Sequence, residues 1–197
     1  MINRIDVSCD LYSNLVTRPT GAAVRLEIEH QLDEIGDRAL AILDFSHVRL
    51  LDFSCADEIV AKLLLQYVSQ DIPRREVYFI FFGMTESHLY AIDAVLERHG
   101  LALVTQLADG NPCLVGVVDG EQRRIWEAMS ELGSGGPADV ATASGLDPDR
   151  VKSCLEDLWR RRLVIRQEDS YESLRGVPPA FSAHLTTPGE TGPVKAS

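Results

Sequence analysis

The stretch from Ala39 to Tyr67 constrains the fold more than any other part of the sequence. It opens with a short apolar run, Ala39 to Phe45, which is typical of a strand buried on both faces of a sheet. A second short strand is expected from Val48 to Leu51. Apolar residues then recur at spacings of three and four, which predicts an amphipathic helix. Its expected buried positions are Ala56, Ile59, Val60, Leu63, Leu64 and Tyr67.

The start of this helix is polar and acidic. Ser54 is expected to cap the helix, with its hydroxyl oxygen accepting a backbone amide. Asp52 comes just before it, and the face opposite the apolar stripe carries the remaining polar side chains. These are Asp57, Glu58, Lys62 and Gln66. A buried strand is therefore expected to lead to a helix start that holds one hydroxyl among three carboxylates.

The rest of the first 119 residues alternates between helix and strand patterns. A weak strand pattern covers residues 3 to 8, and an amphipathic helix is expected from Thr20 to Gly36. Glu76 to Phe82 is an aromatic-rich strand, followed by a helix that begins near Thr85 or Ser87 and ends at His99-Gly100. Two more strands, Leu101 to Leu107 and Cys113 to Val118, flank the turn Asp109 to Pro112. This order predicts an α/β domain over 1–119 with a mixed, partly parallel sheet.

The character of the chain changes after Asp119-Gly120. A helix is expected from Glu121 to Leu132, a short one from Pro137, and a third after the turn at Gly145-Leu146. A small hairpin of 163–166 and 171–174 follows. These elements predict a second domain over 120–175. Residues 176–197 are rich in Pro, Gly, Ser and Thr, and a flexible tail is expected there.

Two segments carry a resemblance to a known family. The run LDFSHVRLLDFSCADEIVAKLL resembles the centre of a STAS-like domain, the fold of anti-sigma-factor antagonists, and Thr17-Arg18-Pro19-Thr20-Gly21 with Arg25 resembles the segment preceding it. The similarity spans Arg4 to Val118. Phe53 stands where the antagonist loop has a hydroxyl, and Cys55 stands where it has glycine.

The order of elements over 120–175 resembles a winged-helix module.

The STAS-like resemblance implies a regulatory protein that works through protein contacts. It implies that Ser54 is a phosphoacceptor, and the alternative is that Ser54 only caps its helix. The partner-binding surface is expected at the helix start, and the expected partner is a histidine-kinase-like ATPase. The residues of this predicted surface are Asp52, Asp57, Glu58 and Lys62.

No arrangement of side chains in the sequence predicts catalysis, and the protein is expected not to be an enzyme. Arg18, Thr20 and Arg25 lie near a helix start and form a candidate anion site. The favoured alternative is that these arginines pair with Asp44 or Asp52. The four cysteines are scattered singly, which argues against a disulfide framework and a metal centre. No cofactor is expected.

The predicted winged helix raises the question of DNA binding. Arg150, Lys152 and the cluster Arg160-Arg161-Arg162 are the candidate DNA contacts, in a transcription regulator as the alternative function. Yet residues 121 to 175 contain nine basic and eleven acidic side chains, a net charge of -2. Asp147 and Asp149 also precede Arg150 on the helix that would read bases. A role in protein interaction or dimerisation is therefore preferred, and the oligomeric state stays open.

Charge and hydropathy limit the remaining function classes. The net charge of -11 and the pI near 4.8 disfavour a general polyanion binder, because affinity for nucleic acid rests largely on phosphate neutralisation. No apolar run has the length needed to cross a bilayer, and the first residues lack the apolar core of a signal peptide. A cytoplasmic protein without membrane contact is expected.

Overall fold

The computed structural model describes residues 3–7, 13–35, 38–68, 75–106 and 111–175, with side chains from residue 13 onward. Its centre is a five-stranded sheet in the order β1-β3-β5-β6-β7. The strands are β1 Asn3–Val7, β3 Arg38–Asp44, β5 Glu76–Phe82, β6 Ala102–Gln106 and β7 Pro112–Gly116. The first four run parallel to one another, whereas β7 pairs antiparallel with β6. The expectation of a mixed α/β fold is confirmed.

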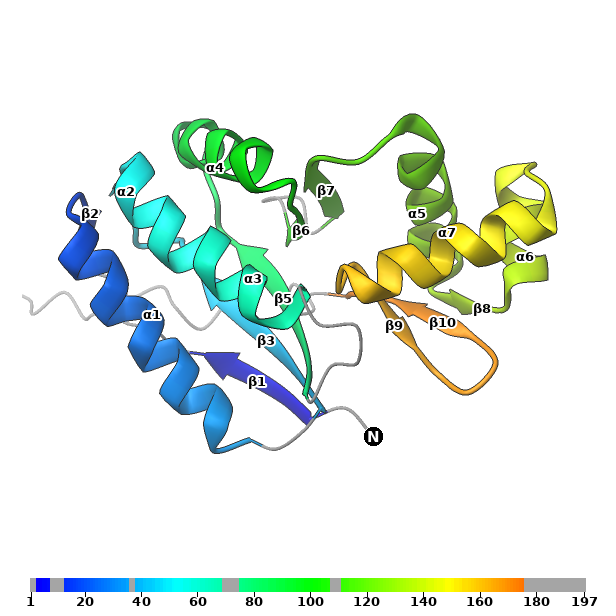
Figure 1. Cartoon of the computed structure of the whole chain (residues 1–197), viewed down its shortest axis with the longest axis horizontal. Helices are drawn as coiled ribbons and strands as arrows, with labels where there is room; N and C mark the ends of the chain where they lie inside the picture. The colour runs from blue at the N-terminus through cyan, green and yellow to red at the C-terminus, as the bar shows by residue number, and fades with distance from the viewer. Residues whose placement is uncertain (1–2, 8–12, 36–37, 69–74, 107–110, 176–197) are drawn as a thin grey trace, which may run out of the picture.

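One face of this sheet is covered by helices (Figure 1). They are α1 Arg18–Asp33, the continuous series α2 Phe53–Ala56, η1 Asp57–Lys62 and α3 Leu63–Val68, and α4 Glu86–His99. Alternate strand residues such as Leu43, Phe79 and Leu103 point toward them, as expected for side chains on a pleated strand. A short parallel pair, β2 Asn14–Leu15 and β4 Leu50–Leu51, lies at the start of α1 and α2.

The last part of the described chain forms a helical module with a small antiparallel sheet. Its helices are α5 Gly120–Leu132, α6 Pro137–Ser144 and α7 Pro148–Arg160. Its strands are β8 Ser134–Gly135, β9 Val164–Arg166 and β10 Tyr171–Ser173, in the order β8-β10-β9. Asp119 accepts a hydrogen bond from the Gln122 amide at 2.7 Å and so caps α5 at the predicted boundary.

The module and the main sheet share one hydrophobic core. Strand residues on the sheet's second face, such as Leu40, Ile80 and Val104, belong to the same buried cluster as residues of α5 and α7. Arg162 lies within this interface and is only 3% exposed. Its guanidinium sits 5.7 Å from the ring centre of Tyr78 in β5 and 5.8 Å from that of Trp159 in α7. The two parts are therefore packed together rather than tethered.

Helix boundaries differ from the expected ones in two places. Helix α1 begins at Arg18, because Thr17 rather than Thr20 caps it by accepting the Thr20 amide at 3.4 Å. The helix after β4 contains a π-helical segment, η1, which periodicity alone does not predict. The predicted tail over 176–197, Gly36, and the first two residues of the predicted turn Asp109 to Pro112 lie outside the described residues.

In the part of the chain that the structure describes, no helix combines the length and the apolar character that a membrane span requires.

Candidate functional site at the start of helix α2

Asp52, not Ser54, caps helix α2. The Oδ1 atom of Asp52 accepts hydrogen bonds from the Cys55 amide at 2.8 Å and from the Ser54 hydroxyl at 2.9 Å. Partial burial raises the pKa of Asp52, but these hydrogen bonds outweigh it and hold the pKa below its ordinary value. The expectation that Ser54 is the cap was wrong, because the aspartate two residues earlier already occupies that position.

Ser54 lies within the first turn of α2 and is half-buried. Its hydroxyl donates to the Asp52 carboxylate, so the two side chains form one hydrogen-bonded pair. A phosphate on Ser54 would bring roughly 1.5 to 2 negative charges against that carboxylate and would displace this bond. Modification would therefore change the local structure of the helix start as well as its charge.

Asp57 and Glu58 are internal rather than exposed, which corrects the expectation of an acidic surface. Asp57 is 5% exposed and Glu58 is 3% exposed. Arg18 Nη1 donates to Asp57 at 3.1 Å and to Glu58 at 2.8 Å, and His99 Nε2 lies 2.9 Å from the other Asp57 oxygen. Lys62 pairs with Glu58 from one turn away. A partner therefore cannot contact these two carboxylates directly.

This network shifts the pKa of both carboxyl groups. Burial raises the pKa of Asp57, but the hydrogen bonds with His99 and Arg18 more than offset this and lower it below its ordinary value. Burial also raises the pKa of Glu58, but the hydrogen bonds with Lys62 and Arg18 more than offset this and lower the pKa below its ordinary value. Both groups are held as anions: Asp57 by Arg18 of α1 and a hydrogen bond with His99 of α4, and Glu58 by Arg18 and Lys62 of η1. The network is thus a structural link between three helices.

The predicted anion site is occupied by the protein's own carboxylates. Arg18 pairs with Asp57 and Glu58, and Arg25 pairs with Glu29 and lies 3.6 Å from Glu58. Ion pairing of these arginines is confirmed, although Asp44 and Asp52 were the wrong partners. Thr20 faces the helix cap, with its hydroxyl 2.8 Å from that of Thr17. Among the described residues, this arrangement leaves no anion-binding cradle at Thr20.

The close approach of α1 to α2 and η1 depends on Gly21. A methyl group at Gly21 would lie 3.0 Å from the Cα atom of Cys55 and 3.1 Å from Cβ of Glu58. The glycine therefore brings Arg18, three residues earlier, within reach of the buried carboxylates. Sequence reasoning noted Gly21 only within a resembling segment and missed the pairing of His99 with Asp57. The glycine inside a predicted helix was the available signal for the close helix contact at Gly21.

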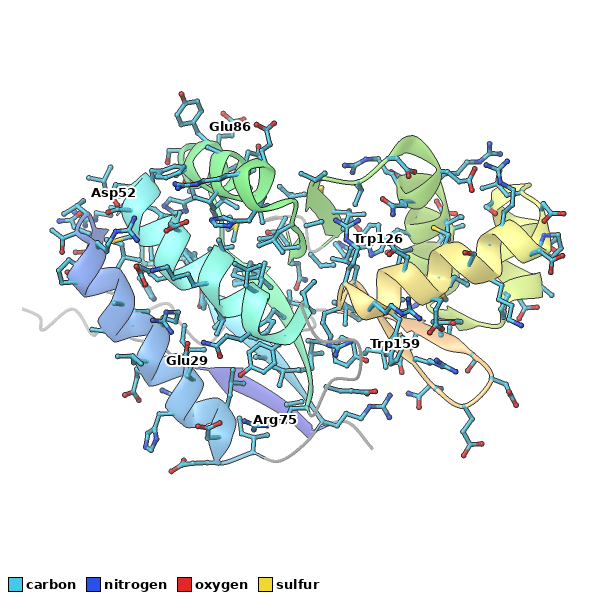
Figure 2. All side chains as sticks on the ribbon, viewed as in Figure 1. Glu29, Asp52, Arg75, Glu86, Trp126 and Trp159 are labelled. Carbon is cyan, nitrogen blue, oxygen red and sulfur yellow. The ribbon has the colours of Figure 1, made fainter. Side chains whose placement is uncertain are left out.

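The start of α2 also carries an exposed apolar surface. Phe53 is 39% exposed, and Val16 and Leu50 are exposed on the neighbouring segments: β2 and β4 pair with each other, Val16 directly follows β2, and β4 leads through Asp52 to Phe53. We call Val16, Leu50 and Phe53 the Phe53 surface. Arg98 of α4 lies over the Phe53 ring, 6.0 Å from its centre. Figure 2 shows the labelled Asp52 at this end of the helices.

Cys55 has the features of a structural thiol. It is buried, and its Sγ atom donates to the carbonyl of Thr17 at 2.9 Å. Burial raises the pKa of the thiol, and the nearby Asp52 carboxylate raises it further. Cys55 is therefore not an activated nucleophile. Among the described residues no group of three or more His, Cys, Asp or Glu is arranged to hold a metal ion.

The candidate DNA contacts separate into two groups. Arg161 donates to Gln122 of α5 and to the carbonyl of Val117 after β7, and Arg162 is buried against Tyr78 of the main sheet. The burial of Arg162 makes it unavailable for a phosphate contact, whereas Arg161 is only partly buried. Arg150 and Arg160 are exposed but pair with Glu121 and Glu156, and Lys152 is exposed.

Replacing Asp52 with alanine is expected to destabilise the protein by about 1 kcal/mol, which is typical for loss of a helix cap. The change removes the acceptor for the Cys55 amide and the Ser54 hydroxyl. Urea unfolding measures the loss. The matched variant Asp52→Asn keeps an acceptor oxygen and should lose less stability; equal losses would contradict the capping role.

Comparison of the chain with protein-family models, with curated proteins and with solved structures finds no match.

Proposed function

We propose that this protein is a non-enzymatic regulator that binds a protein partner through the Phe53 surface. The partner proposed is a histidine-kinase-like ATPase of the anti-sigma type, and the proposal places the protein in the cytoplasm. The observation that carries it is an exposed phenylalanine at the start of α2, together with an exposed aliphatic residue on each of the paired segments β2 and β4 or directly after them. The resemblance to STAS-like domains at the same residues supports the choice of partner.

The composition of the Phe53 surface suits a protein contact. Aromatic and arginine side chains dominate the binding energy of many interfaces, and here Arg98 lies over Phe53. Arg18, whose side chain is about half exposed, follows Val16 along the chain. The carboxylates originally expected to bind the partner instead fix α1, η1 and α4 beneath this surface. Their role in the proposal is to hold the surface rigid.

Ser54 gives this surface a means of regulation. It directly follows Phe53, and its hydroxyl is bonded to Asp52. A phosphate there would add charge beside the aromatic ring and break the bond to the cap, which favours release of an apolar partner. In the alternative, Ser54 serves only the helix start and the partner is controlled in another way.

The test is affinity capture with the intact protein, followed by mass spectrometry of the bound proteins and of Ser54. Phe53→Ser is expected to lose the ATPase, with at least about a tenfold fall in affinity when the purified pair is measured. The control is Leu132→Ser, since Leu132 is also apolar and 43% exposed but lies at the end of α5. Retention of the ATPase by Phe53→Ser, or its loss with Leu132→Ser, would contradict the assignment.

A DNA-binding transcription regulator is the second candidate. The strand order β8-β10-β9 and the exposed Lys152 near the start of α7 favour it, together with Arg150, which is exposed but paired with Glu121. Against it, Asp149 on the same turn and Glu168-Asp169 in the β9–β10 turn are also exposed and would repel phosphates. In the same capture experiment, recovery of DNA without an ATPase, lost with Lys152→Ala, would favour this candidate over the first.

A further inference from the structure

A groove of about 550 Å³ lies between α4 and β7, at the edge of the main sheet. One wall is formed by α4, the floor by β7 and the residues after it, and the far end by α5. Its lining includes Asp93, Glu97, Leu114, Val115, Val117 and Arg123. The groove is separate from the Phe53 surface, because α4 turns Arg98 and His99 toward α2 and η1.

The acidic wall of the groove is not neutralised by the protein. Asp93 and Glu97 are exposed, one helical turn apart, and neither carboxylate has an ion pair or hydrogen bond with a described residue. Arg123 also lines the groove and donates to the carbonyl of Leu114 at 2.8 Å; this bond leaves its charge intact, so the lining carries two negative charges and one positive charge. Two like charges at this spacing destabilise a helix slightly, so a cation placed between them would be stabilised.

The floor of the groove is apolar and belongs to an edge strand. Val117 is exposed, and Val115 is partly buried against the core. No described strand pairs with the outer side of β7. Because the Leu114 carbonyl is already bonded to Arg123, an incoming segment cannot add as a complete further strand. Recognition would therefore rest on side chains.

We propose that this groove binds a basic, partly apolar segment of another protein. A lysine or arginine of that segment would place its charged end between Asp93 and Glu97 and its aliphatic stem along the apolar floor. An adjacent aliphatic side chain would cover Val117. Charge complementarity selects this occupant, since two carboxylates and one guanidinium leave the lining with a net negative charge and the acidic wall is exposed.

A short fluorescent peptide of alternating lysine and valine tests the proposal, with the intact protein at physiological salt. The variant Asp93→Asn/Glu97→Gln is expected to weaken binding by about tenfold. The control is Glu127→Gln/Glu131→Gln, which removes the same charge at the same spacing from the exposed face of α5. It should change the affinity by less than about twofold, because neither carboxylate lines the groove and exposed charges that do not contact the ligand are largely screened at this salt concentration.

Three outcomes would overturn the proposal. Equal losses in both double variants would show only general attraction to a protein of net charge -11. Undetectable binding of the peptide to the unaltered protein would exclude a basic, partly apolar segment as the ligand of the groove. Equal affinity for a peptide in which serine replaces valine would exclude the apolar contact. The Phe53→Ser variant should bind this peptide normally, so failure here is distinguishable from failure of the proposed function.

Discussion

Replacing Glu58 with alanine is expected to lower the free energy of unfolding by about 3 kcal/mol, near the lower end of the range for breaking a buried ion pair. The carboxylate is 3% exposed and contacts Arg18, Lys62 and Arg25. Its loss removes the anion that holds α1 against η1 and leaves Arg25 largely buried. The effect stays at the lower end because Arg18 and Lys62 are partly exposed and can return to water.

Urea denaturation followed by circular dichroism measures this loss. The control is Glu131→Ala, which removes an exposed carboxylate without a described partner and should change stability by less than about 0.5 kcal/mol. Glu58→Gln retains the shape and part of the hydrogen bonding, so an intermediate loss is expected. A loss at Glu58→Ala no larger than the control's would mean that the ion pairs do not stabilise the fold.

Replacing Gly83 with alanine should also destabilise the protein by about 3 kcal/mol, from backbone strain and overpacking together. Gly83 follows β5 with a φ of 70°, in the left-handed region that disfavours other residues. An added Cβ would lie 2.7 Å from the backbone nitrogen of Ser46 and 2.9 Å from its Cα atom. Because the obstacle is backbone, the β3–β4 and β5–α4 connections would have to separate.

The matched change is Gly120→Ala. Gly120 begins α5, and a Cβ there meets nothing within 4 Å. Alanine at this position should be neutral or stabilising by up to about 1 kcal/mol, because it reduces the freedom of the unfolded chain. Thermal unfolding of both variants checks the pair, and a similar melting temperature for the two would contradict the steric argument.

The apolar pattern of the sequence predicted most of the architecture. All six positions expected to be buried in the helix after β4, from Ala56 to Tyr67, are buried. The strands at Arg38–Asp44 and Glu76–Phe82 also lie where the apolar runs predict them. Local periodicity was sufficient to predict these elements and their buried faces, because an apolar run must bury its side chains whichever element it packs against.

The candidate site was predicted less well, because its chemistry depends on contacts between distant segments. Periodicity places a charged residue on the exposed face, yet Asp57 and Glu58 are buried by partners about 40 residues away. The π-helical segment changes which positions face inward. Arg162 shows the same limit: beside two other arginines it suggests a phosphate contact, whereas it lies inside the interface with Tyr78.

Arg162 packs between Tyr78 of the main sheet and Trp159 of α7, and so helps to fix the position of the helical module relative to the sheet. Since the module is seated on the sheet by a shared core, the exposed start of α7 and the Phe53 surface are held at one separation and one orientation (Figure 1). A partner that contacts both surfaces at once must have two binding regions at the same separation and orientation. Selectivity among related partners would then depend on distance as well as on the chemistry of either surface.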